Sequence, residues 1–177
     1  IGRFNLQTAP DVIAADIRNE IDFTLAAQRR FPDRDALFRG LRRKLEDIGI
    51  FVQLFGDLGS HHSRIPPEEF RGLVLLDELA PFIVINPNDA AAAFLFTLLH
   101  EVAHIWVGEG GISNSSPFEG GVAANATEQL CNKVAAEFLV PREPVLADWR
   151  ALAPELTVGQ KVQTLASSWK VSRAMMA

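Results

Sequence analysis

The chain has 177 residues, of which 48% are hydrophobic and 22% charged, so it can bury a sizeable core as one medium domain or as a core domain with a small appendage. Its formal net charge of −5 excludes an overall positive field for nucleic acid, although a local basic patch stays open. The single cysteine, Cys131, excludes an internal disulfide framework and fits a reducing compartment.

The ends of the chain and its longest apolar run bear on where the protein works. No secretory leader is visible at the N-terminus. The longest apolar run, residues 90–99, is too short to span a bilayer. These features predict a soluble, cytoplasmic protein without a membrane partner. The chain starts at Ile1 and stops within what reads as a helix, which is compatible with a piece of a longer protein.

The first half of the chain predicts two amphipathic helices followed by a small sheet. Apolar residues at helical spacing predict a helix over residues 11–30. A second apolar stripe predicts a helix over residues 34–49. Short runs of β-forming residues then predict three strands, at residues 50–55, 72–77 and 81–86.

The second half is predominantly helical. The segment "NPND", residues 86–89, supplies turn and N-cap residues before a long helix predicted at residues 90–107, which Gly108 ends. A loop rich in glycine, serine and asparagine is predicted at residues 108–126. Further helices follow at residues 127–140, 143–152 and 157–168.

This order of elements predicts an α+β fold in which a short antiparallel or mixed sheet packs on helices. We expect one domain over residues 1–152, including the N-terminal helices. Residues 153–177 are expected to form a separate helical C-terminal segment.

The long helix carries the sequence "HEVAH", in which His100 and His104 lie four residues apart. Positions i and i+4 share one helix face, so both imidazoles can aim at one point. Zinc accepts imidazole readily and needs three protein ligands in a catalytic site. Glu101 stands one step around the helix, where a carboxylate can remove a proton from water at the metal. The motif therefore predicts a zinc site with Glu101 as general base.

The alternative is an ordinary buried helix that carries two histidines by chance. A third ligand decides between the two interpretations, and the downstream helix offers candidates. Glu128 can hold the metal, with Asn132 one turn later supporting a liganding histidine. Glu137 is better explained as a solvated or ion-paired residue, and Cys131 as a small buried thiol.

Three stretches of the sequence together resemble the ImmA/IrrE family of zinc metallopeptidases. They are "FRGLVLLDELAPFIVIN", "FTLLHEVAH" and "EQLCNKVAAEFLVP", and the resemblance covers roughly residues 37–145. It implies a zincin-like fold in which His100, His104 and Glu128 bind zinc and Glu101 is the general base. It also implies site-specific cleavage of a helix-turn-helix transcriptional repressor, which links the protein to transcription regulation and stress response.

The residue that stabilises the oxyanion is not assigned. The chain has no tyrosine, so the tyrosine donor that some zincins use is excluded. His61, His62, Arg64 and Arg71 are the available substitutes.

The strand predicted at residues 81–86 has two interpretations. It can form the edge on which an extended substrate peptide pairs, with its scissile carbonyl near the metal. The alternative is an interior strand that is paired on both sides.

The C-terminal sequence "LASSWKVSRAMM" resembles the start of a helix-turn-helix, with Ser172 placed to cap the last helix. After Glu155 the charged residues are all basic, which allows weak contact with DNA phosphates or docking on a DNA-bound repressor. An amphipathic packing helix is the alternative. The rival functions are therefore a non-catalytic zincin-fold binding module of a transcriptional regulator or toxin–antitoxin system, and zinc-dependent hydrolysis of a small molecule.

Overall fold

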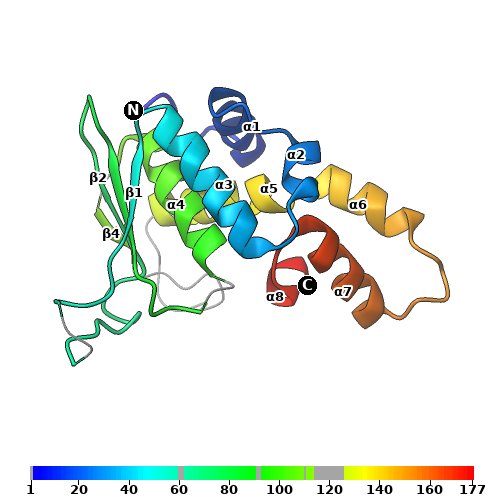
Figure 1. Ribbon diagram of the computed structural model, residues 1–177. Coiled ribbons are helices and arrows are strands. Elements are labelled where there is room, and N and C mark those ends of the chain that lie inside the picture. Colours follow the sequence, from blue (N-terminus) through cyan, green and yellow to red (C-terminus); the bar gives the residue numbers. More distant parts are fainter. Residues whose placement is uncertain (1, 60–61, 91–92, 110, 114–125) are drawn as a thin grey trace.

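A computed structural model of the protein describes residues 2–59, 62–90, 93–109, 111–113 and 126–177 (Figure 1). Helices and strands alternate in blocks along these residues. In chain order they are α1 (Pro10–Glu20), α2 (Leu25–Arg30), α3 (Arg34–Asp47), β1 (Phe51–Leu54), β2 (Gly72–Leu75), β3 (Phe82–Ile85), α4 (Phe94–Val107), β4 (Gly111–Ser113), α5 (Ala126–Leu139), α6 (Arg142–Ala151), α7 (Val158–Trp169) and α8 (Arg173–Met176).

The helix predicted at residues 11–30 is two helices, α1 and α2. The chain turns between them at Asp22, whose φ of 46° lies in the left-handed region. The Thr24 hydroxyl then accepts a hydrogen bond from the backbone N–H of Ala27 and caps α2. The spacing of the apolar residues does not predict the break between the two helices, because the capping threonine does not interrupt the apolar pattern.

The four strands form one mixed sheet in the order β1-β3-β2-β4. β1 and β3 are parallel, whereas β2 is antiparallel to both β3 and β4. The predicted α+β class with a short antiparallel or mixed sheet is therefore confirmed. The interpretation of residues 81–86 as an edge strand is wrong, because β1 and β2 pair with β3 on its two sides.

The sequence does not predict β4. This strand has three residues and lies in the segment for which the glycine, serine and asparagine content indicates a loop. Among the described strands, β4 and β1 are the two edges of the sheet.

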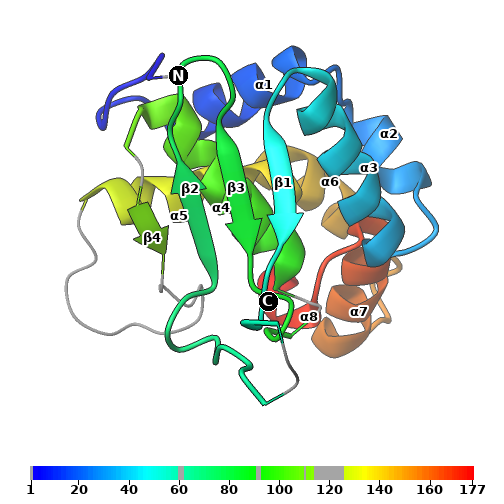
Figure 2. The ribbon, with the colours of Figure 1, turned by 60° about the vertical axis from the view of Figure 1, so that its left-hand side comes forward.

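The helices cover one face of the sheet, and Figure 2 shows the strands in front of them. α4 packs directly on the inner face, against Val74 and Ile83, and α5 and α3 flank it. The core continues from there to the C-terminal helix, since Leu98, Phe138 and Trp169 are all fully buried. The opposite face of the sheet carries several apolar side chains, among them Leu73, Phe82 and Val84.

α4 ends as its sequence predicts, but it begins differently. Gly108 adopts a φ of 81° and closes the helix, and the N–H groups of Gly2 and Phe4 bond to the carbonyls of Ile105 and Trp106. The predicted capping by residues 86–89 is wrong. Those residues form a turn, and the N-cap is Ala93, which has no side-chain cap.

The C-terminal helices pack into the same core as α4 and α5. α7 buries Leu165 and Trp169, so it is an amphipathic packing helix, and α8 follows it after a turn at Lys170. The Ser172 hydroxyl accepts a hydrogen bond from the backbone N–H of Met175, which confirms the predicted cap. No helix among the described residues has the length and apolar character needed to cross a membrane.

Candidate metal centre

α4 provides two residues of the candidate site. Nearly all faces of this helix are apolar and buried, so its position is fixed by packing. Leu98, Leu99 and Val102 lie in the core, which fixes the rotation of the helix. The i, i+4 spacing then places His100 and His104 together on the face that meets α5. Both histidines are almost completely buried.

Glu128, in the first turn of α5, completes a group of three ligand residues. The Nε2 atoms of His100 and His104 are 3.1 Å apart. The Glu128 carboxylate spans them, with Oε2 3.2 Å from His100 Nε2 and Oε1 3.1 Å from His104 Nε2. Ligands at the zinc distances of roughly 2.0–2.2 Å in a tetrahedron stand about 3.4 Å apart. The donor set and its spacing therefore fit a metal ion such as zinc.

The electrostatics of the group show how strongly these residues favour a positive charge. Hydrogen bonds from His100 and His104 hold the pKa of Glu128 far below its usual value. Burial of His104 lowers its pKa, but contacts with Cys131 and Glu128 outweigh burial and raise it to about 10. The same contacts that stabilise a proton on His104 would favour a metal cation between these residues.

His104 is oriented by a chain of contacts that the sequence did not predict. The backbone carbonyl of Glu109 lies 2.8 Å from His104 Nδ1 and can only accept, so Nδ1 donates and Nε2 is the nitrogen that faces His100 and Glu128. The Glu109 carboxylate in turn accepts a hydrogen bond of 2.6 Å from Thr127, next to Glu128. The only signal in the sequence is the helix stop at Gly108, which folds Glu109 back toward the helix end.

Asn132 does not provide the support that was predicted for it. Its Oδ1 atom and the Nδ1 atom of His100 are both buried, and neither has a hydrogen-bond partner among the described residues. The prediction rested on the position of Asn132 on the same helix face as Glu128. To support a histidine ligand, however, the amide must also lie within hydrogen-bond distance of the imidazole nitrogen.

Glu101 lies on α4 beside the ligands and is completely buried. Its carboxylate faces the sheet at Gly72, where an added Cβ would overlap Oε1 and lie 2.8 Å from Cδ. The prediction that Glu101 acts as general base stays a prediction; the residue lies on the helix that carries both histidines.

The other candidates lie outside the three-residue group. Cys131 is a fully buried thiol whose pKa is raised by burial, in line with the small-thiol interpretation. Glu137 accepts a hydrogen bond from the backbone N–H of Arg142, and burial raises its pKa. Of the four oxyanion candidates, His61 lies outside the described residues. Arg71 pairs with Asp89 at 3.2 Å, and His62 and Arg64 are exposed.

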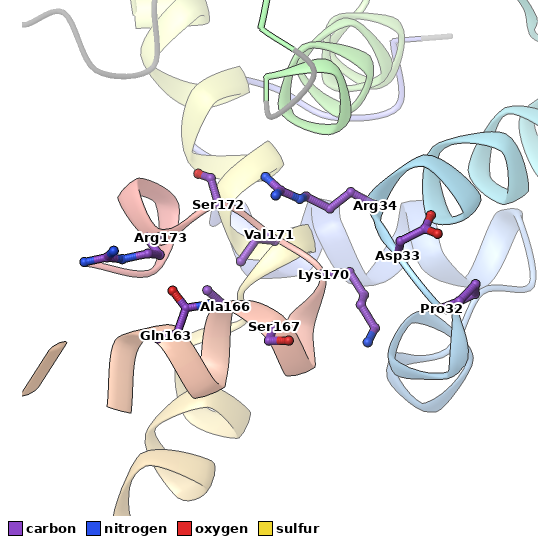
Figure 3. Close-up of a pocket in the computed structure, with 10 residues that line it drawn as sticks. All are labelled: Pro32, Asp33, Arg34, Gln163, Ala166, Ser167, Lys170, Val171, Ser172 and Arg173. Atoms are coloured by element: carbon purple, nitrogen blue, oxygen red, sulfur yellow. The ribbon is translucent and has the colours of Figure 1, made fainter. Parts of the chain in front are cut away.

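A second feature lies away from the metal group, between the start of α3 and the α7–α8 turn. Arg34, Lys170 and Arg173 line a cavity of about 400 Å³ there, together with Asp33, which caps α3. Figure 3 shows Arg34 reaching from α3 toward the turn that carries Val171 and Ser172. The cationic side chains outnumber the acidic one, so the cavity favours an anionic group.

Comparison with known protein families gives a match over most of the chain. A peptidase family model described as "IrrE N-terminal-like domain" matches residues 46–177, which is more than half of the chain. The match runs beyond the predicted resemblance over residues 37–145 to include the C-terminal helices. No curated protein matches the chain.

Proposed function

The chain belongs to the IrrE N-terminal-like family of metallopeptidases, and from that premise we propose that it is a zinc-dependent endopeptidase that hydrolyses a peptide bond in a regulatory protein. The observation that carries the proposal is the convergence of three ligand residues from α4 and α5, whose imidazole nitrogens and carboxylate oxygens approach one another to 3.1–3.2 Å. Two imidazoles and one carboxylate leave a fourth coordination position open, as catalytic zinc sites do.

The three ligand residues and Glu101 each have a role in the proposed reaction. Bound zinc would lower the pKa of a water molecule to about 7 and polarise the substrate carbonyl. His100, His104 and Glu128 would hold the ion in place. Glu101 takes the proton of the attacking water and gives it to the leaving amine, so its carboxylate must reach both positions.

An extended peptide is the substrate shape that the sheet suits best. β4 pairs with β2 on one side and is an edge among the described strands. Its Ser113 is in register with Gly72, the residue that contacts Glu101. A peptide that pairs with the outer edge of β4 would extend the sheet on the β4 side of Gly72, two strand spacings, or about 10 Å, from it. We therefore propose β4, and not β3, as the strand on which a substrate peptide pairs.

The proposed substrate is a helix-turn-helix repressor, on the strength of the family resemblance, and it can be tested by mixing. The purified, zinc-loaded protein is incubated with a candidate helix-turn-helix repressor, first the product of the adjacent reading frame if it is one, and fragments are identified by mass. Glu101→Gln is expected to lower cleavage by about 100-fold or more while zinc content stays the same. Glu137→Gln is the matched control, because it makes the same change of residue type on α5, which carries Glu128, but at a position outside the metal group. Undiminished cleavage by Glu101→Gln would contradict the proposal.

A second candidate function is a binding module, and the basic cavity of Figure 3 favours it. In this proposal the α7–α8 region binds DNA phosphates or an acidic partner, whether or not the metal site hydrolyses peptides. Salt-dependent DNA binding that is lost in Lys170→Glu and Arg173→Glu would support it. Lys133→Glu, an exposed change of equal charge on α5, is the control. No binding at low salt would exclude the DNA form of this proposal.

A further inference from the structure

Gly72 occupies a position in the sheet that a larger residue would normally fill. It begins β2 and pairs with Ile85 of β3 on one side and with Ser113 of β4 on the other. Val74, two residues later on the same face, is 1% exposed and packs toward the helices. Glycine inside a strand loses packing and chain entropy, so its use there often marks a close approach by another group.

The group that approaches Gly72 is the Glu101 side chain. A Cβ at Gly72 would overlap Oε1 of Glu101 and would lie 2.8 Å from its Cδ and 2.9 Å from its Cγ. Carbon atoms that are not bonded prefer about 3.5–4.0 Å. Glu101 has no exposed surface, so it has no solvent space into which it can turn. Neighbouring strands on both sides of Gly72 keep its backbone from moving away.

We propose that Gly72 is a positioning residue for the general base, and that its missing side chain creates the space in which the Glu101 carboxylate rests. This inference rests on the proposed function for the role of Glu101, but not for the contact itself. A methyl group at position 72 would push the carboxylate back by on the order of 1 Å. A displacement of that size costs roughly 100-fold in rate, because proton transfer needs hydrogen-bond geometry.

The contact is tested first in metal-free protein, without any activity measurement. Gly72→Ala, Glu101→Ala and the double variant are compared by thermal unfolding. Gly72→Ala in the native background is expected to lower Tm by about 3–10 °C, the range for an overpacked core in a domain of this size. In the Glu101→Ala background the same change should cost nothing, because the new methyl group fills vacated space. An equal Tm loss in both backgrounds would overturn the contact.

The positioning role is tested next, with zinc-loaded protein and, as substrate, the repressor that the protein cleaves in the mixing experiment. Gly72→Ala is expected to lower kcat by about 100-fold while KM and zinc content stay unchanged. Glu101→Asp has a shorter side chain, so adding Gly72→Ala to it should cost no further activity. Gly159→Ala is the control, since a Cβ at Gly159 would meet nothing within 4 Å.

Two results of this second test would overturn the positioning role. They are native kcat in Gly72→Ala, and an equal loss of kcat from Gly72→Ala in the native and the Glu101→Asp backgrounds. The failure of the proposed function looks different, because Glu101→Gln would then cleave normally. The Tm coupling in metal-free protein would still decide whether Gly72 makes room for Glu101.

Discussion

At the scale of single residues, Glu128 stands out because each of its two carboxylate oxygens faces a different histidine. A carboxylate shared in this way contacts the Nε2 atoms of both imidazoles, and it stays ionised because both contacts favour the charged form. The same arrangement means that a proton and a metal ion compete for one place. Zinc binding should therefore release a proton and weaken as the pH falls.

We expect the stability of the metal-free protein to depend on this group in a defined pH window. The folded state raises the pKa of His104 from 6.5 to about 10, so the stabilisation by protonated His104 is complete below pH 6.5 and is lost as pH rises toward 10. The pKa of Glu128 lies below its usual 4.5, so its contribution is present above pH 4.5 and is lost as pH falls through the lower, folded-state value. Urea unfolding should therefore give a larger free energy at about pH 6 than at about pH 9.

The control for this pH dependence is Glu128→Gln, because the contacts of Cys131 and Glu128 raise the pKa of His104 and this change removes the charge of the second. Its unfolding free energy should change less between the two pH values. If the native protein and the variant show the same change, the His104–Glu128 contact is not its source.

Thr127→Val is expected to weaken zinc binding without removing a ligand. The Thr127 hydroxyl bonds to the Glu109 carboxylate, and the Glu109 carbonyl orients His104. Loss of such outer support costs about 10-fold to 100-fold in metal affinity, and this indirect contact belongs at the lower end. Competition with a chromogenic chelator measures the change. Thr164→Val, in which an exposed hydroxyl on α7 is lost, should bind zinc as the native protein does.

At the scale of elements, Gln28 joins three helices that are far apart in the sequence. Its Nε2 donates to the carbonyls of Leu139 and Trp169, at the ends of α5 and α7, while its Oε1 accepts from Arg18 of α1. Because Gln28 is fully buried, these bonds satisfy helix-end carbonyls that water does not reach. The short helix α2 thus holds the ends of α5 and α7 together.

Gln28→Ala should therefore destabilise the protein by about 2–4 kcal/mol, since two buried carbonyls lose their donor and a cavity is left. Chemical denaturation measures the change in the free energy of unfolding. Gln163→Ala, an exposed glutamine on α7, should shift it by less than about 0.5 kcal/mol. Equal values for the two variants would show that the Gln28 contacts contribute little.

At the scale of the whole molecule, the C-terminal helices α7 and α8 pack into the same hydrophobic core as α4 and α5. Trp169 and Leu165 are buried in the same cluster as Phe138 of α5. Deleting residues 153–177 is therefore expected to remove most of the stability of the protein, since a single buried tryptophan is worth about 3–5 kcal/mol of the total of about 5–15. Circular dichroism should show a truncated chain that melts at a much lower temperature or has no cooperative transition.

The opposite result would support the predicted boundary between residues 152 and 153. A truncated chain that melts at the native temperature would mean that residues 1–152 are an independent domain. For the same reason, DNA binding is better tested by charge reversal at Lys170 and Arg173 than by truncation.

The sequence predicted those parts of the site that depend on local geometry. His100 and His104 converge because four residues make about one helical turn, and Glu128 follows from its place at the start of the next helix together with the family resemblance. The contact of Gly72 with Glu101 and that of Glu109 with His104 join residues that only the folded chain brings together. β4 was missed because three residues carry too short a pattern, and β3 was misplaced because strand order does not follow from strand composition.

The bonds from residues 2–4 to the end of α4 have a practical consequence for the choice of a purification tag. Backbone hydrogen bonds hold Gly2 and Phe4 beside Ile105 and Trp106, directly after His104. A polyhistidine tag fused before residue 1 would emerge near the metal helix, where its imidazoles can compete for zinc. A tag at the C-terminus would emerge beside α8, away from the N-terminus (Figure 1). Zinc titrations are therefore best carried out on protein whose N-terminal tag has been removed.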